Sequence, residues 1–99
     1  MGDLDTARSF LFVPGDRPER FEKAMNAGAH AVIIDLEDAV APKNKAEARR
    51  NVISFLDGTS NQNILLRIND ADSAFFNDDL AAANHPRLSG VILPKAEQK

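Results

Sequence analysis

Charged and amide side chains follow each of four short apolar segments in this chain. In chain order they are Asp16 with Arg17; Asp35 with Glu37 and Asp38; Arg67 with Asn69; and Lys95. Carboxylate oxygens suit a hard cation such as Mg²⁺, and the planar fork of an arginine suits a carboxylate. We therefore predict that the four segments position part of one active site.

Helical periodicity between the apolar segments indicates that strands and helices alternate. Strands are expected at 9–13, 31–36, 63–69 and 90–94, with helices between Asp16 and Gly28, at 45–56 and at 77–84. Strands that alternate with helices run parallel in one sheet, and their carboxyl ends lie at one edge. The order 1-2-3-4, with all helices on one face, would bring the four charged groups together and direct Arg67 inward.

Capping patterns mark the first two predicted helices. Asp16 and Asn44 are each followed by a glutamate three residues later, which is typical of a helix N-terminus. Gly28 suits the turn after a helix. In the second helix, the side chains expected to face the core are Ala48, Val52, Phe55 and Leu56.

The second and third strands each have one apolar face and one mixed face. On the mixed faces lie Ile33, Asp35 and Glu37, and then Leu65, Arg67 and Asn69. An open doubly wound sheet is apolar on both faces, whereas a barrel interior becomes polar near its mouth. The predicted fold class is therefore α/β, with about four βα units as the amino-terminal half of a (β/α)₈ barrel, because a whole barrel needs about 250 residues. Residues 1–99 would be a single partial domain, completed by further chain or by a partner, with 1–8 as a flexible lead-in.

The composition excludes several classes of function. The chain has no cysteine, which excludes disulfides, thiolate metal sites and a thiol nucleophile. A net charge of −3 with interspersed signs argues against a nucleic-acid surface. No apolar run approaches the roughly 20 residues of a membrane helix, and the polar start does not resemble a signal peptide. We expect a cytoplasmic protein with no nucleic-acid or membrane partner.

Four strings between Arg8 and Glu97 carry a resemblance to the HpcH/HpaI aldolase and citrate lyase β-subunit family. They are RSFLFVPGDRPERFEKA, IIDLEDAVAPKNKAEAR, LLRIN and VILPKAE. The resemblance implies a TIM barrel that makes or breaks a carbon–carbon bond next to a thioester or a 2-oxo acid. It also implies Mg²⁺ as cofactor and a homo-oligomer, either a trimer or a hexamer.

The activity implied by the resemblance is a retro-Claisen cleavage. A β-hydroxyacyl thioester of citryl, malyl or citramalyl type would give an acetyl-type thioester and a 2-oxo acid, on CoA or on an acyl carrier protein. Two alternatives remain open: a pyruvate-type aldolase, and a non-catalytic fragment. The family's direct Mg²⁺ ligands resemble a Glu and an Asp from later strands, so we expect residues 1–99 to be inactive by themselves.

The resemblance also assigns roles to residues around the predicted mouth. Arg67 corresponds to the arginine that binds the substrate carboxylate; the alternative is that it pairs with Asp35 or Glu37 to hold the strands in register. Glu37 and Asp38 would bond metal-bound waters rather than the ion itself. Asn69 is expected to bond a neighbouring loop.

Four further residues are expected to bind substrate. By resemblance, Phe12, Arg17 and Lys23 contact a coenzyme A thioester, and Arg17 at a helix start would also suit phosphate. The alternative is that Phe12 is a core residue and that the two cations are solvated. Lys95 could form a Schiff base, but the metal-dependent family chemistry favours pairing with Glu37.

Overall fold

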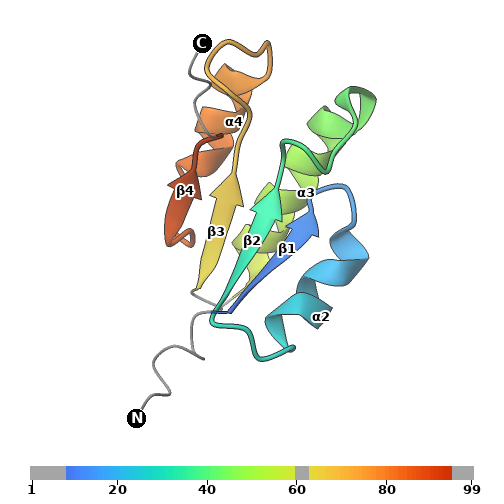
Figure 1. The fold of residues 1–99 in the computed structure, drawn as a ribbon, viewed down its shortest axis with the longest axis vertical. Coiled ribbons are helices and arrows are strands. Elements are labelled where there is room, and N and C mark those ends of the chain that lie inside the picture. The colour runs from blue at the N-terminus through green and yellow to red at the C-terminus, as the bar shows by residue number, and fades with distance from the viewer. Residues whose placement is uncertain (1–8, 60–62, 95–99) are drawn as a thin grey trace.

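The computed structural model describes residues 9–59 and 63–94. Strands and helices follow one another in the predicted alternation (Figure 1). The strands are β1 (Phe10–Pro14), β2 (Ala31–Asp35), β3 (Ile64–Arg67) and β4 (Gly90–Ile92). The helices are η1 (Pro18–Arg20), α2 (Phe21–Met25), η2 (Pro42–Asn44), α3 (Lys45–Gly58) and α4 (Phe76–Ala83), of which η1 and η2 are 3₁₀ turns. Each strand begins within one residue of its predicted start, whereas β3 and β4 each end two residues before their predicted ends.

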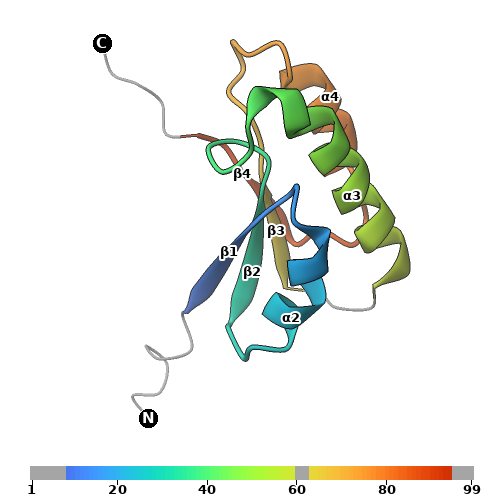
Figure 2. The same cartoon turned by 90° about the vertical axis from the view of Figure 1, so that its right-hand side faces the viewer.

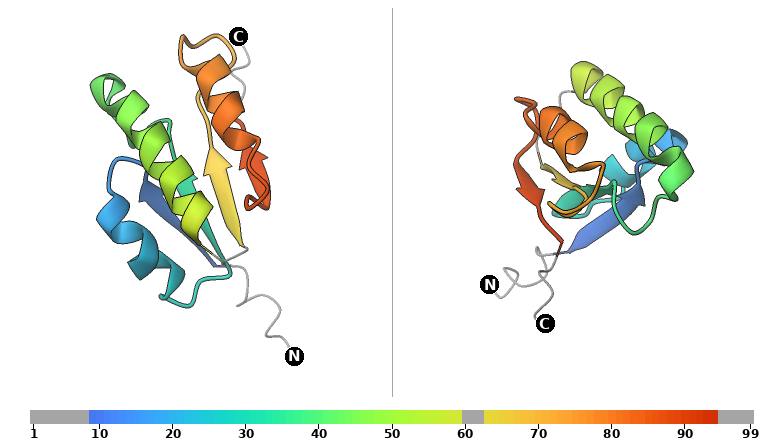
Figure 3. Two further views of the ribbon diagram at one scale, coloured as in Figure 1. Left: turned by 180° about the vertical axis from the view of Figure 1, so that it is seen from behind. Right: turned by 90° about the horizontal axis from the view of Figure 1, so that it is seen from above.

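The four strands form one parallel sheet in the order β1-β2-β3-β4. Seen edge-on, α2, α3 and α4 lie on the same side of this sheet (Figure 2). The view from behind shows α3 and α4 side by side in front of the strands, with α2 next to β1 (Figure 3). Within the described residues, the other face carries no helix. The predicted α/β class and strand order are confirmed.

The hydrophobic core lies between the sheet and the helices. Val13, Ile34 and Leu66 stand in register across three strands, and all are buried. The predicted stripe of α3 covers them: Ala48, Val52 and Leu56 are fully buried, and Phe55 packs at the margin. Burying one such aliphatic side chain stabilises a fold by about 1.5–3 kcal/mol. Burial of apolar side chains in this core therefore contributes most to holding the helices against the sheet.

On the opposite face, side chains stack in layers from strand to strand. Phe12, Ile33 and Leu65 stand in register in one layer. Asp35 and Arg67 form the next layer toward the carboxyl ends. Layers of this kind fill the inside of a TIM barrel. The helix-free face thus corresponds to a barrel interior, with its charged layer at the mouth.

The predicted helix between Asp16 and Gly28 is wrong in its extent and in its cap. The segment forms η1 and then α2, which has five residues. Asp16 caps neither, because its Oδ2 accepts a hydrogen bond from Nδ2 of Asn44 at 3.2 Å. Asn44 precedes α3 as predicted but makes no side-chain cap bond there. The side chains of Asp16 and Asn44 therefore join the β1–α2 loop to the start of α3 instead of capping helices. Gly28 turns the chain after α2 with a φ of +90°.

Gly15 allows the loop after β1 to approach the end of β2. Its N–H donates to the carbonyl oxygen of Asp35 at 2.8 Å. A Cβ at this position would lie 2.9 Å from Cδ2 of Leu36 and 3.1 Å from Cβ of Ala48. Glycine is therefore favoured at position 15, because a larger residue would press on Leu36 and Ala48.

Two sequence predictions concern residues outside the described ranges. The flexible lead-in at 1–8 is one, and the position of Lys95 is the other. The extent of the domain stays a prediction. The described helices include none that is long and apolar enough to cross a membrane.

Candidate active site

Arg67 and Asp35 form a two-pronged ion pair across β2 and β3. Nε of Arg67 donates to Oδ1 of Asp35 at 3.0 Å, and Nη2 donates to Oδ2 at 2.7 Å. The two residues are direct partners in the strand register. Arg67 lies on the helix-free face, as predicted. It also pairs with Asp35, which is the contact expected if Arg67 holds the two strands in register.

The pair with Asp35 leaves one side of the guanidinium open. An arginine offers two donor pairs, and Asp35 takes the one formed by Nε and Nη2. The pair formed by Nη1 and the second Nη2 hydrogen has no acceptor among the described residues, and 25% of the side chain is exposed. The Phe12 ring centroid lies 5.2 Å from Cζ of Arg67, within the range of cation–π attraction. Within the described residues, Arg67 is thus held on two sides and open on a third.

Asp35 stays ionised although it is buried. Burial raises the pKa of its carboxyl, but hydrogen bonds from Arg67 and from two backbone N–H groups outweigh burial and hold the pKa below its ordinary value. The backbone donors are Glu37, at 2.8 Å, and Ala39, at 3.0 Å. Asp35 therefore fixes both the arginine and the acidic loop, which we define as residues 35–39.

Glu37 carries its charge in less favourable surroundings. Burial and the neighbouring carboxylate of Asp38 raise the pKa of Glu37, although Nε of Arg67 lies 3.4 Å from its Oε1 and opposes that shift. Asp38 is exposed. The repulsion between these two carboxylates disfavours the ionised form of Glu37, and a positive charge placed nearby would relieve it.

Sequence reasoning missed Lys45, which reaches the acidic loop from the start of α3. Its Nζ donates to the carbonyl oxygen of Leu36 at 2.9 Å and to that of Glu37 at 2.7 Å. A signal for its burial was present. Lys45 continues the stripe of Ala48 and Val52 toward the N-terminus at helical spacing.

Asn69 does not lie on the interior face, contrary to the alternation pattern. β3 ends at Arg67, so strand alternation stops before this residue. Nδ2 of Asn69 donates to Oδ2 of Asp79 at 2.6 Å and to the carbonyl oxygen of Leu36 at 2.9 Å. Asp79 also accepts from Nε of Arg49 at 3.0 Å. The predicted bond to a neighbouring loop is confirmed, within a network that ties α3 and α4 to the strand ends.

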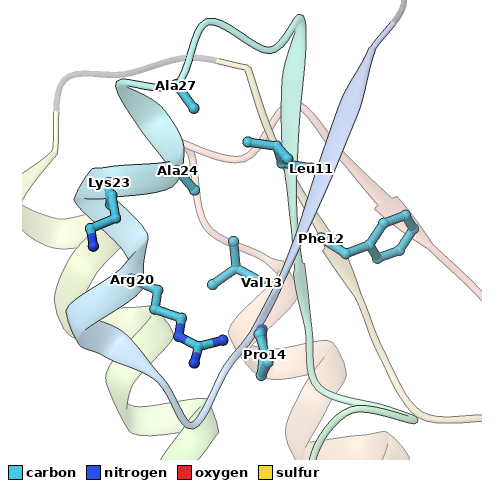
Figure 4. Close-up of a pocket in the computed structure, with 8 residues that line it drawn as sticks. All are labelled: Leu11, Phe12, Val13, Pro14, Arg20, Lys23, Ala24 and Ala27. Atoms are coloured by element: carbon cyan, nitrogen blue, oxygen red, sulfur yellow. The ribbon is translucent and has the colours of Figure 1, made fainter.

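The cations predicted near β1 do not join the charged layer. Arg17 is exposed, with Nη1 4.0 Å from Oε2 of Glu19, and it precedes a 3₁₀ turn too short to add a helix dipole. Lys23 lies on α2, on the opposite side of β1 from the ring of Phe12 (Figure 4). Together with Arg20, which was not predicted, Lys23 lines a hollow of about 450 Å³ between β1 and α2. The regular spacing of Arg17, Arg20 and Lys23 was the only sequence signal for Arg20.

Mg²⁺ coordination requires oxygen ligands in near-octahedral geometry. The described residues include no group of three or more His, Cys, Asp or Glu that could hold an ion. Both carboxylate oxygens of Asp35 already accept hydrogen bonds from Arg67 and the backbone. Glu37 and Asp38 remain as acceptors near the mouth. They fit the predicted role of bonding water around an ion.

A parallel sheet with helices on one face and charge at the end of the other defines the amino-terminal portion of a TIM-barrel-type fold. The family model described as HpcH/HpaI aldolase/citrate lyase matches residues 8–99. The chain belongs to this family, so the resemblance found in the sequence is confirmed.

The chain is similar in sequence to a known lyase and in structure to solved complexes of related proteins. An L-malyl-CoA/β-methylmalyl-CoA lyase of Cereibacter sphaeroides is 40% identical over 93 residues, which cover 89% of this chain and 29% of that protein. A citrate lyase β subunit of Mycobacterium tuberculosis with oxaloacetate and magnesium matches with a TM-score of 0.76 and 39% identity, covering 97% of this chain and 42% of its own. CitE of the same organism with magnesium, acetoacetate and coenzyme A matches with a TM-score of 0.72 and 41% identity, covering 90% and 32%. The chain spans less than half the length of each.

Proposed function

We propose that the intact protein is a Mg²⁺-dependent carbon–carbon lyase that cleaves a β-hydroxyacyl thioester of citryl, malyl or citramalyl type. Its products would be an acetyl-type thioester and a 2-oxo acid. One observation carries the proposal: the guanidinium of Arg67 lies at the carboxyl end of the helix-free face, fixed by Asp35 and Phe12, and one of its donor pairs has no acceptor among the described residues. The malyl-CoA lyase among the relatives supports the reaction class.

The cleavage breaks the bond between the hydroxyl-bearing carbon and the carbon next to the thioester. The hydroxyl proton passes to a base, and the electron pair of the broken bond forms the thioester enolate. The hydroxyl-bearing carbon becomes the carbonyl of the 2-oxo acid, and protonation of the enolate gives the acetyl-type thioester. Arg67 would bind the carboxylate beside the reacting carbon, and this orientation lowers the barrier.

The acidic loop would place negative charge near the proposed Mg²⁺ and the carboxylate-binding side of Arg67. Mg²⁺, when bound, would supply positive charge beside the oxygen atoms of the 2-oxo acid. The magnesium complexes of the Mycobacterium tuberculosis proteins support this cofactor. Glu37 and Asp38 would accept hydrogen bonds from water around the ion, and Arg67 would balance the carboxylate of Asp35.

The thioester end of the substrate would lie against β1 and α2. Arg17, Arg20 and Lys23 offer cations that suit the phosphates of coenzyme A, and the coenzyme A complex of the relative supports this carrier. An acyl carrier protein is the alternative carrier. Because Phe12 and Lys23 lie on opposite sides of β1, only an extended ligand would contact both (Figure 4). Pairing of Lys95 with Glu37, a trimeric or hexameric assembly and a cytoplasmic location are further parts of the proposal.

The test is a product assay on the intact protein with malyl-CoA, citramalyl-CoA and citryl-CoA in the presence of Mg²⁺. Equal amounts of acetyl-CoA and a 2-oxo acid are expected from at least one of them. Arg67→Met should reduce kcat/KM by about 100-fold or more, because a charge-stabilising donor is lost. Arg50→Met, which removes an exposed cation of α3, serves as the control.

Other products would point elsewhere. Free CoA with an intact hydroxy acid would show thioester hydrolysis in place of cleavage. Cleavage of a 4-hydroxy-2-oxo acid with no activity on any thioester would show the pyruvate-type aldolase. Absence of a 2-oxo acid product from every thioester contradicts the proposed function.

A further inference from the structure

Lys45 is a buried lysine at a position where helix chemistry disfavours a cation. Only 7% of the residue is exposed, and it is the first residue of α3. Helix N-termini carry partial positive charge, so a lysine there is repelled. Burial lowers the pKa of Lys45, against the opposing effect of Asp79 and Asp35. A cation in such a place needs strong bonds to balance these costs.

The two hydrogen bonds from Nζ of Lys45 to Leu36 and Glu37 fix the course of the acidic loop. Its Nζ holds the carbonyl oxygens of Leu36 and Glu37 at 2.9 and 2.7 Å and lies 5.5 Å from the ring centroid of Phe75. The carbonyl of Glu37 also accepts the N–H of Val40 at 3.2 Å. One ammonium group therefore ties two consecutive peptide units to the start of α3.

A second donor reaches the same place from the other side. The carbonyl oxygen of Leu36 accepts Nδ2 of Asn69 as well as Nζ of Lys45. The carboxylate of Asp35 binds the N–H groups of Glu37 and Ala39. The loop backbone is thus held at its carbonyl groups by Lys45 and Asn69, and at its N–H groups by Asp35.

We propose that Lys45 is a positioning residue: its ammonium group fixes the backbone of the acidic loop so that Glu37 and Asp38 stay at the mouth beside Arg67. Lys45 acts through backbone oxygens, in a buried position behind the loop. The predicted consequence for turnover rests on the proposed function, but the structural claim about the loop does not. A merely structural lysine would stabilise the fold without affecting the loop more than the rest of the chain.

The structural claim is tested by amide hydrogen exchange of the intact protein. In Lys45→Met, the amides of Glu37, Ala39 and Val40 should exchange at least tenfold faster than in the unchanged protein, with much smaller changes in the centre of α3. Lys43→Met is the matched control, because Lys43 is an exposed lysine of the same segment. Lys45→Gln replaces Lys45→Met if the latter fails to fold. Loop amides that accelerate no more than those of α3 overturn the proposal.

The functional claim is tested by kinetics below the unfolding temperature. Lys45→Met should lower kcat about 10- to 100-fold, the usual effect of losing an outer support of a metal site. The KM for thioester should change little, and Lys45→Arg should restore part of kcat. A lower Tm with unchanged kcat overturns the positioning role. If the unchanged protein cleaves no thioester, the proposed function fails, and hydrogen exchange by itself decides whether Lys45 fixes the loop.

Discussion

Two neighbouring side chains hold Arg67 in one orientation on the helix-free face. Asp35 fixes the plane of its guanidinium through two hydrogen bonds, and the ring of Phe12 covers it. A side chain already held in its binding geometry loses less conformational entropy when it binds. The pair with Asp35 joins two strands, as the register interpretation requires. Under the proposed function, the same pair would orient Arg67 toward a substrate carboxylate.

Asp35→Asn should lower the free energy of unfolding at pH 7 by about 2–3 kcal/mol, since Arg67 loses its charged partner at a partly buried site. Folding lowers the pKa of Asp35. Its contribution is therefore present above the unfolded pKa and lost as pH falls through the folded pKa, so stability should decline below about pH 4. Urea unfolding at several pH values checks this. Equal acid dependence in both proteins would contradict the assignment.

Glu37→Gln should separate stability from function. The pKa of Glu37 is raised by burial and by Asp38, so its ionised form disfavours the folded state at neutral pH. The variant should unfold at an equal or higher free energy, by up to about 0.5 kcal/mol, while its Mg²⁺-dependent turnover falls. Calorimetric unfolding and a Mg²⁺ titration of activity measure both. Lower stability together with normal turnover would assign Glu37 a purely structural role.

At the scale of elements, the β1–α2 loop lies close to the end of β2, where the N–H of Gly15 donates to the carbonyl oxygen of Asp35. Gly15→Ala should destabilise the protein by about 1–3 kcal/mol, because its Cβ would press on Leu36 and Ala48. Gly58→Ala is the matched control: a Cβ there meets nothing within 4 Å, and alanine favours the helix. Thermal unfolding of the two variants compares them. Equal stability would mean that the loop can shift without cost.

Strand positions followed from the sequence because each buried strand is a short apolar run bounded by turn residues. Helix starts were less predictable. The side chains of Asp16 and Asn44 have the right spacing for caps, yet a hydrogen bond between residues 28 positions apart takes both. Lys45 and Asp79 were missed for the same reason, since their roles depend on partners brought near by the fold. The charged layer was predictable in part. Strand alternation, which is local, places Asp35 and Arg67 on the mixed faces at the carboxyl ends of their strands. Their direct pairing depends on the register of two strands and joins residues 32 positions apart.

For the whole molecule, the helix-free face and the sheet edges shape the behaviour of residues 1–99 in isolation. Phe10 and Phe12 on β1 are 50% and 55% exposed, and Leu93, just after β4, is 61% exposed. We expect the isolated chain to bind Mg²⁺ weakly and to cleave no thioester, because a water-exposed mouth weakens electrostatic stabilisation. Calorimetric titration and a malyl-CoA assay check this. Micromolar Mg²⁺ affinity with measurable cleavage would show that the metal site lies within residues 1–99.

The central claim is that the open donor pair of Arg67 binds the carboxylate of a 2-oxo acid. Its most direct test is the Kd of oxaloacetate for the intact protein with Mg²⁺, measured by calorimetry for Arg67→Lys and Arg49→Lys. Both variants keep a positive charge but lose the planar guanidinium of an arginine that pairs with an aspartate. Arg67 pairs with Asp35 on the interior face, whereas the control, Arg49, pairs with Asp79 between α3 and α4. Arg67→Lys should weaken binding at least tenfold, which is about 1.4 kcal/mol, while Arg49→Lys should leave Kd unchanged. Unchanged affinity in Arg67→Lys, with only a loss of stability, would contradict the claim.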